Sequence, residues 1–345
     1  MSDRARSLVP CLLVAGALAA GCVAEPPETG VVTDALTCTG FGCNGNSPVI
    51  AGAPFSELHR SSLVANAQGL RIVEFRSASG TPFQIDVRQA RLVGLDALGS
   101  VALDTPGMTN AVLRVDDAHG HHWEIRIAEM GTIAFWAPPM GVVTTYRLKV
   151  REVGGEETEL CNRPPEPTGW PSNVFNAIVF EGERYDPEHK TILATGPAAA
   201  GWFNIACAGS VPAKLHLNRH TDVGANPAKP TTVPERQALL RAYAAAVCWN
   251  SDSFTAMGEP LLLYDRKEVM PKPTSLANVE GLWGPGGAIC LGEQRLVHAR
   301  ALPQVDADSL LRQLAVQCPA VPACSAIAGF PLNWKQHGLV LTLNP

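Results

Sequence analysis

The sequence predicts a mainly β protein with some α structure (α+β). In it, an N-terminal antiparallel sandwich or barrel-like domain precedes a disulfide-stapled α+β domain. Apolar and polar residues alternate with period two from Gly69 to about Val153, a strongly capped helical pattern follows residue 230, and cysteines are spread over the whole chain. With 345 residues the chain is long enough for about two domains.

The first residues resemble the export signal of a lipoprotein, which we place at residues 1–21. The apolar run Leu8–Ala20 follows two arginines and is too short to span a bilayer. Small residues then precede Cys22, as in a lipobox, and Val23 in place of an aspartate resembles lipoproteins sent to the outer membrane. Lipidation of Cys22 would anchor the chain to a membrane. The alternative is an ordinary secretory signal that is cleaved nearby.

Residues 22–48 are expected to form a tether, because a stiff Pro-rich stretch is followed by a Gly-rich one. A β-rich domain is expected at 49–155 and an α+β domain at 156–345. Turn-rich segments at 154–158 and 163–171 mark the boundary between the two domains.

Three segments of the β-rich domain carry clear strand patterns, with apolar residues on one face only. Hairpin turns are expected at Ser79-Gly80 and at Asp117 to Gly120. The apolar sets are Phe83, Ile85 and Val87; Trp123, Ile125 and Ile127; and Tyr146, Leu148 and Val150.

The best-defined helix begins at Thr232, which forms a capping box with Glu235. An apolar stripe continues to Val247, so the helix is expected to end near Cys248, with Arg236 and Arg241 largely off the buried stripe. Other elements of this domain are short strands at 176–180, 191–194 and 261–263, a second helix at 306–317 capped by Asp306, and a closing strand around Leu339, Leu341 and Leu343.

Several short pieces of sequence lie in order between about Cys161 and Arg300: FEGERY (180–185), WFNIACAG (202–209), KLHLNRH (214–220), Ala245-Ala246-Val247-Cys248, Phe254-Thr255, Gly258, Tyr264-Asp265 and GAICL (287–291). Together they resemble the ADYC-domain family. The resemblance implies an exported protein or lipoprotein of a kind found mostly in myxobacteria, with no assigned activity. The signature itself diverges, because Ala246 and Val247 stand where the family has Asp and Tyr.

Eight cysteines remain once Cys11 leaves with the signal and Cys22 takes lipid, and an even number in an exported chain favours disulfides. Spacing suggests Cys38–Cys43, Cys318–Cys324, Cys161–Cys207 and Cys248–Cys290, although sequence alone leaves the connectivity open. The alternative to disulfides is a zinc site, which needs more closely spaced pairs of cysteines. We therefore predict no metal.

Four clusters are candidates for chemistry, and each has a simpler explanation. His119, His121 and His122 could bind a metal but lie at a hairpin turn. Asp186, Glu188 and His189 could serve in acid–base chemistry but fit a solvated turn. Asp306 and Asp308 fit a helix start better than a calcium loop, and Gly284 to Gly287 lacks the lysine of a phosphate-binding loop. We therefore assign no catalytic residue and no cofactor.

Charge excludes one class of partner. The net charge is −5, the pI is near 6.0 and no basic stripe occurs, so nucleic-acid binding is not expected. The sequence favours an envelope-anchored or secreted lipoprotein, placed on either face of the outer membrane, with a non-enzymatic structural or binding role toward a protein or a polysaccharide. The alternative is a hydrolase of envelope or extracellular polymer whose site is assembled from distant residues.

Overall fold

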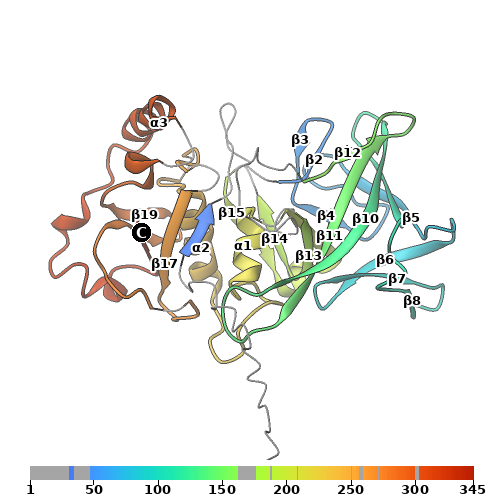
Figure 1. Cartoon of the computed structure of the whole chain (residues 1–345), viewed down its shortest axis with the longest axis horizontal. Helices are drawn as coiled ribbons and strands as arrows, with labels where there is room; N and C mark the ends of the chain where they lie inside the picture. The colour runs from blue at the N-terminus through green and yellow to red at the C-terminus, as the bar shows by residue number, and fades with distance from the viewer. Residues whose placement is uncertain are drawn as a thin grey trace, which may run out of the picture.

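The computed structural model describes residues 31–34, 47–161, 176–186, 189–207, 209–249, 251–255, 259–270, 272–299 and 303–345. Two antiparallel β assemblies lie at opposite ends of the molecule, and the helices α1 and α2 lie between them (Figure 1). The mainly β, α+β fold class predicted from the sequence is therefore confirmed.

An eleven-stranded antiparallel sheet forms the N-terminal half. Ten of its strands follow the order β4-β16-β13-β11-β10-β9-β5-β6-β7-β8, and β12 pairs with β11. Its strands are β4 (Glu57–His59), β5 (Arg71–Arg76), β6 (Pro82–Arg88), β7 (Arg91–Leu95), β8 (Val101–Leu103), β9 (Val112–Asp116), β10 (His122–Ala134), β11 (Val142–Glu152), β12 (Thr158–Glu159), β13 (Ala177–Glu181) and β16 (Trp202–Cys207).

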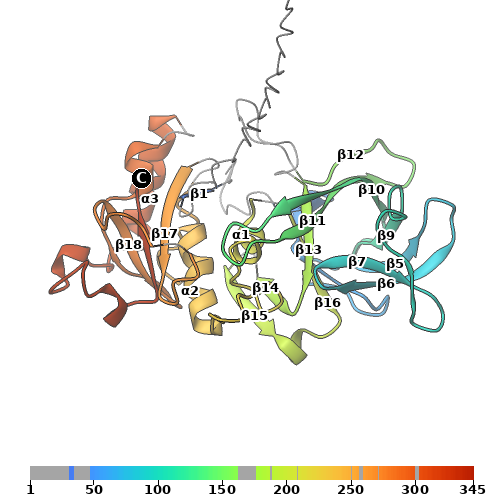
Figure 2. The ribbon, with the colours of Figure 1, turned by 60° about the horizontal axis from the view of Figure 1, so that its bottom comes forward.

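The alternating pattern explains how this sheet buries its core. Ile125 and Ile127 of β10 and Leu148 and Val150 of β11 are buried, whereas Arg126 between the two isoleucines reaches Glu157 at the surface. The sheet curls so that β13 packs against β6 and β7 and β4 packs against β5 (Figure 2). A single apolar cluster fills the inside of this curled sheet.

The sheet continues across the expected boundary at residues 155 and 156. β13 pairs with β11 and β16 pairs with β13, so strands from both sides of the boundary share one hydrogen-bonded ladder. Two small two-stranded sheets flank it. They are β2 (Val49–Ile50) with β3 (Ala53–Pro54), and β14 (Glu183–Asp186) with β15 (Thr191–Thr195).

A five-stranded sheet in the order β1-β17-β20-β18-β19 forms the C-terminal half. The strand β1, inside the expected tether, pairs with β17. The strands are β1 (Val31–Asp34), β17 (Glu259–Asp265), β18 (Val279–Gly284), β19 (Gly287–Leu291) and β20 (Val340–Leu343). The helices are α1 (Val211–Leu217), α2 (Val233–Ala244) and α3 (Gln304–Gln317), with short 3-10 turns η2 (Gly196–Ala199), η3 (Arg295–His298), η4 (Cys324–Ala326) and η5 (Trp334–Gln336).

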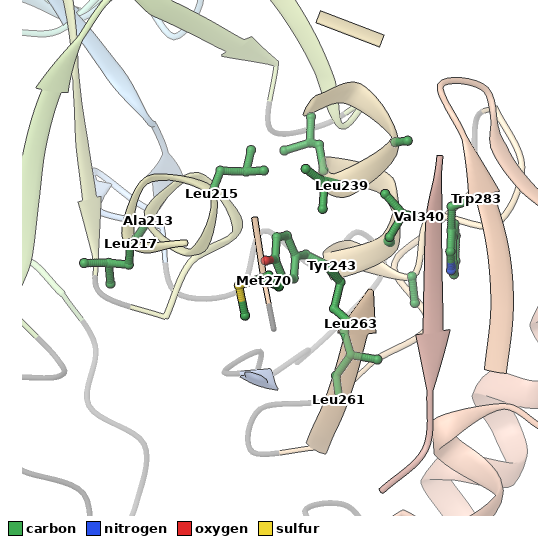
Figure 3. Close-up of a cluster of buried hydrophobic side chains, with 14 of the residues drawn as sticks. Ala213, Leu215, Leu217, Leu239, Tyr243, Leu261, Leu263, Met270, Trp283 and Val340 are labelled. Atoms are coloured by element: carbon green, nitrogen blue, oxygen red, sulfur yellow. The ribbon is translucent and has the colours of Figure 1, made fainter. Parts of the chain in front are cut away.

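Helix α2 packs against α1 on one side and against β18, β19 and β20 on the other. Figure 3 shows Leu239 and Tyr243 of α2 between Leu215 of α1 and Val340 of β20. The predicted capping box is present, since Thr232 Oγ1 accepts from Glu235 N and Glu235 Oε2 accepts from Thr232 N.

Two expectations about α2 were wrong. The helix ends at Ala244, before Cys248, because Ala245 takes a left-handed conformation with φ of 45°. Arg236 and Arg241 are buried rather than off the buried stripe, because the helix is enclosed on all sides. Arg236 pairs with Glu183, and Arg241 Nη1 donates to Trp249 O.

Helix α3 also begins earlier than expected. It starts at Gln304 with Pro303 as its N-cap, so Asp306 lies in the first turn, where its charge favours the helix dipole. Asp308 accepts a hydrogen bond from Gln304, one turn before it.

Three disulfides join cysteines of the described chain, and they indicate an oxidising, extracytoplasmic compartment. The expected Cys161–Cys207 pair is confirmed. The expected Cys248–Cys290 and Cys318–Cys324 pairs are wrong, because Cys248 joins Cys318 and Cys290 joins Cys324. α3 ends next to Cys318 and brings it to Cys248, which lies beyond the end of α2, and spacing along the chain does not reveal this contact. Cys22, Cys38 and Cys43 lie outside the described residues.

Candidate binding groove

Three open pockets on the β-rich half of the molecule are neighbours, because each shares a wall residue with the next. The first two, of about 350 Å³ each, share Arg60 in their walls. The second and the third, which measures about 490 Å³, share Glu181. We call this chain of pockets the groove, its middle member the central pocket, and its largest member the His216 pocket after the histidine in its wall.

The groove begins where two strands separate. β5 and β6 pair only through Phe75 with Phe83 and Arg76 with Pro82. Beyond Phe83, β6 pairs with β7 on its other side instead. The first pocket lies in this opening, lined by residues 72–75 of β5, residues 83–85 of β6 and residues 59–62.

The central pocket combines charge with an aromatic ring. Asp86 is held by Arg60 Nη1 at 3.2 Å and by Arg88 Nε at 3.1 Å. The ring of Trp202 is covered on one side by the Arg184 guanidinium, 3.7 Å from its centroid, and meets His59 edge-on. Glycine and alanine residues from 196–201 form much of the remaining wall, which leaves backbone groups accessible.

Glu181, at the end of β13, connects the central pocket with the His216 pocket. Its carboxylate accepts hydrogen bonds from Gln89 N at 3.0 Å and Ala90 N at 3.3 Å. These two residues form the β6–β7 turn with φ of 52° and 56°, a left-handed conformation that costs roughly 1–2 kcal/mol per non-glycine residue. The carboxylate therefore stabilises a strained turn. Burial raises the pKa of Glu181, and the charge of Asp86 acts in the same direction.

His216 belongs to α1 and is 1 % exposed. Its ring stacks on Phe180 with centroids 4.6 Å apart and planes at 11°. Nδ1 lies 2.9 Å from Thr221 Oγ1, whereas Nε2 has no hydrogen-bond partner in the described part of the chain. Burial, with the nearby charge of Arg219, lowers the pKa of His216 to about 3, so the imidazole is neutral at ordinary pH.

A second group of polar residues holds the fold together rather than lining the groove. Glu280 of β18 and Arg295 are both buried, with Arg295 Nε 2.5 Å from Glu280 Oε1. Arg236 Nε lies 2.5 Å from Glu183 Oε1, and the Tyr185 hydroxyl donates to the same carboxylate. Burial raises the pKa of Glu183 and raises that of Tyr185 well above its ordinary value.

The divergent signature lies inside the core. Ala246 and Val247 are buried, and neither lines the groove. The two apolar residues therefore fit a packing position, where a hydrogen-bonded polar pair can be replaced at little cost. His220 and Asp265, from two other family-like pieces, lie close together nearby, with Nε2 3.7 Å from Oδ2.

None of the four clusters singled out from the sequence forms part of the groove. His119, His121 and His122 are exposed at the β9–β10 turn, with His122 Nδ1 2.6 Å from Asp116. Asp186 and His189 do meet, at 2.7 Å, on an exposed turn, and Glu188 lies outside the described residues.

The glycine-rich segment is the β18–β19 turn, and it approaches protein backbone instead of a phosphate. Gly287 has φ of 125°, and a Cβ placed there would collide with Val247 O. No group of three or more His, Cys, Asp or Glu side chains within the described ranges is arranged to hold a metal ion.

Sequence reasoning missed the groove residues. The alternation of Phe83, Ile85 and Val87 predicts that Asp86 faces solvent, yet it is buried against two arginines. Glu181 and His216 stand inside FEGERY and KLHLNRH, so the one available signal was that both family-like pieces carry ionisable residues among apolar ones.

The sheets and the three disulfides of the described chain define the class: a mainly β, disulfide-bonded extracytoplasmic protein. The chain belongs to the ADYC domain family, whose model matches residues 106–297. The match begins well before Cys161, where the resemblance was expected to start, and it includes β9, β10 and β11. No curated protein and no solved structure matches the chain. Among the helices that the structure describes, none combines the length and apolar character of a membrane-spanning segment.

Proposed function

We propose that this protein is an envelope-anchored binding protein that holds an extended, uncharged polysaccharide in the groove without catalysing a reaction on it. Residues 1–21 would direct export, and acyl chains on Cys22 would hold the mature protein at the outer membrane. The disulfides support the extracytoplasmic part of this proposal.

The observation that carries the proposal is the series of three neighbouring pockets that share wall residues. Arg60 is common to the first and second, and Glu181 to the second and third. Such a series of depressions suits successive units of a chain better than it suits one compact molecule, which would favour a single enclosed cavity.

Polar groups in the central pocket match the hydroxyls of a sugar. The guanidinium of Arg60 donates hydrogen bonds and the carboxylate of Asp86 accepts them, so adjacent hydroxyl groups would find both kinds of partner. The carboxylate of Glu181 in the same wall disfavours an anionic polymer.

Both carboxylates of the central pocket are already engaged, which favours binding over chemistry. Asp86 uses one oxygen toward Arg60 and the other toward Arg88. Glu181 accepts one backbone N–H on each oxygen. A general base needs an accessible lone pair, and these ion pairs and hydrogen bonds engage both oxygens of each carboxylate.

A hydrolase is the second candidate, and one observation favours it. Asp86 and Glu181 line the same pocket, and the raised pKa of Glu181 beside the ion-paired Asp86 is the asymmetry used when one carboxyl group donates a proton and the other acts as an anion.

The test measures binding of the full chain, purified from membranes in mild detergent, to a panel of neutral and anionic polysaccharides. We expect retention on a neutral glycan and about tenfold weaker binding by Asp86→Asn, which loses the ion pairs with Arg60 and Arg88. Glu129→Gln, exposed on β10 away from the groove, is the matched control and should bind normally. Release of reducing ends that stops in Glu181→Gln would favour the hydrolase, and absence of binding to every glycan would exclude both functions.

The anchor has its own test. Cys22→Ala should move the protein from the membrane fraction to the soluble fraction, because the thiol that takes the lipid is gone. Retention of the variant in membranes would show that Cys22 is not the anchor.

A further inference from the structure

We propose that the groove binds a glycan that carries an alkyl chain, with the glycan in the central pocket and the alkyl chain in the His216 pocket. This inference rests on the proposed polysaccharide-binding function and specifies the class of ligand. It follows from a change of character along the groove, which has paired charges in its middle and exposed aliphatic side chains at one end.

Accessible aliphatic side chains form part of the wall of the His216 pocket. Val142 is 67 % exposed and Val223 is 43 % exposed, and both line the pocket. Met140, which is 62 % exposed, precedes Val142 by two residues. Phe135 and Val143 line the same pocket and are buried. A ligand in the pocket would therefore meet apolar surface that is already accessible, which favours an alkyl group.

Hydrogen bonds hold this aliphatic surface in place. Arg219 Nη2 donates to Pro139 O at 2.6 Å, and Asn226 Nδ2 donates to Pro138 O at 3.0 Å. These bonds tie the loop that contains Val223 to the turn between β10 and β11. Because the surface is preorganised in this way, little conformational entropy is lost when a ligand binds to it.

The charged residues of the His216 pocket come from its junction with the central pocket. Glu181 lines both pockets and accepts from Ala90 N, next to Arg91, which also lines the His216 pocket. The junction therefore offers a hydrogen-bond acceptor and a donor, as Asp86 and Arg60 do in the central pocket. Hydroxyl groups of a glycan would find partners in both places.

The two kinds of surface together select the ligand. An alkyl chain alone would leave the polar groups of the central pocket unused, and a glycan alone would leave the aliphatic surface in contact with water. An exposed apolar surface that continues a binding groove indicates a further contact with the ligand. A glycan joined to an alkyl chain matches both surfaces at once.

Two substitutions change the polarity of the aliphatic surface and keep its shape. Val142→Thr and Val223→Thr each replace a methyl group by a hydroxyl group on an exposed β-branched side chain. Val101→Thr is the matched control, because Val101 is also 43 % exposed and lies outside the walls of the three pockets. Each variant is made in the Cys22→Ala form of the full chain, which is expected to need no detergent that could occupy the pocket. Thermal unfolding establishes that each variant is folded.

The probes are cellohexaose, its butyl and octyl β-glycosides, and octanoate, each below the concentration at which it forms micelles. Calorimetry with the Cys22→Ala chain should show roughly twofold tighter binding for each methylene added to the glycoside, which is about half of the free-energy gain for full burial because the pocket is open. The double variant Val142→Thr/Val223→Thr should bind the octyl glycoside about fivefold to tenfold more weakly and cellohexaose as before. Val101→Thr should change neither affinity.

Each contrary result points to a different error. Equal affinity for cellohexaose and its octyl glycoside overturns the alkyl subsite and leaves the polysaccharide function intact. An unchanged dependence on chain length in the double variant would place the alkyl chain elsewhere and also overturns it.

Two further results concern other occupants of this surface. Octanoate that binds as tightly as the octyl glycoside would show a site for a free fatty acid, and self-association that the double variant abolishes would assign the surface to a second copy of the chain. Both overturn the inference. No binding of any probe overturns it as well, whereas the panel of neutral and anionic polysaccharides tests the proposed function separately.

Discussion

The backbones of Val247 and Gly287 are in direct contact. Val247 O accepts a hydrogen bond from Ala288 N at 2.7 Å, and the space beside Gly287 that a side chain would need is filled by the same carbonyl group. Two family-like pieces far apart in sequence, the signature and GAICL, therefore meet through main-chain atoms. This contact fixes the end of the α2 segment against the hairpin of β18 and β19.

The first prediction tests this contact with neighbouring glycines. Gly287→Ala should destabilise the protein by about 2–4 kcal/mol, because the new methyl group meets Val247 O and because φ of 125° is unfavourable for an L residue. Gly286→Ala should change stability by less than about 0.5 kcal/mol, since nothing lies within 4 Å of its added methyl group. Chemical denaturation of the two variants measures the difference, and equal stabilities would contradict the contact.

The second prediction concerns the buried pair of Glu280 and Arg295. Glu280→Gln should cost about 3–5 kcal/mol, because it leaves the Arg295 guanidinium buried opposite a neutral group. A double-mutant cycle uses Glu280→Leu, Arg295→Met and the double variant that combines them. The double variant should lose clearly less stability than the sum of the losses in its two single variants.

A half-buried pair provides the control for this cycle. Arg126 and Glu157 form a bidentate contact at the surface, and their coupling energy should remain below about 1 kcal/mol. Denaturant unfolding of wild type, the two single variants and the double variant of each cycle gives the coupling energy of each pair. A coupling at Glu280–Arg295 no larger than that at the surface would show that the buried pair is not a stabilising unit of the fold.

The third prediction concerns disulfide connectivity. Peptide mapping without reduction should recover the linked pairs Cys161–Cys207, Cys248–Cys318 and Cys290–Cys324. Under limiting reductant the Cys248–Cys318 bond should open first, because Cys248 is half-buried, whereas Cys290 and Cys324 are enclosed in a small apolar cluster. Recovery of a Cys248–Cys290 peptide, or first opening of Cys290–Cys324, would contradict the structure.

Local patterns made much of the fold predictable. The alternation around Trp123, Ile125 and Ile127 depends on neighbouring residues only, and it identified β10. The capping box of Thr232 and Glu235 is likewise contained within four residues, and it identified the start of α2.

Contacts between distant segments could not be predicted in the same way. Burial of Arg236 depends on Glu183, which lies on a strand that precedes the helix by some 50 residues. The partner of Cys248 depends on where α3 packs. The groove needs β4, β6, β13 and α1 to come together, so Asp86, Glu181 and His216 show no common pattern in the sequence.

The fourth prediction is an acid-dependent loss of stability caused by His216. Its pKa is about 3 in the folded protein and about 6.5 in the unfolded chain, so only the unfolded state takes up a proton as the pH falls below 6.5. The stability that the neutral imidazole contributes is therefore complete above pH 6.5 and declines toward pH 3. The slope is about 1.4 kcal/mol per pH unit for one proton, which amounts to roughly 2–3 kcal/mol at pH 4.5.

Substitution separates this contribution from those of other groups. His216→Gln cannot titrate, so its stability should fall less steeply than that of wild type between pH 6.5 and 4.5, even if it is less stable at pH 7. His189→Gln provides the control, because His189 is exposed beside Asp186. Urea unfolding at pH 7, 5.5 and 4.5 gives the three slopes. Parallel slopes for wild type and His216→Gln would mean that His216 takes up a proton in the folded protein, which would contradict the burial of a neutral imidazole at this position.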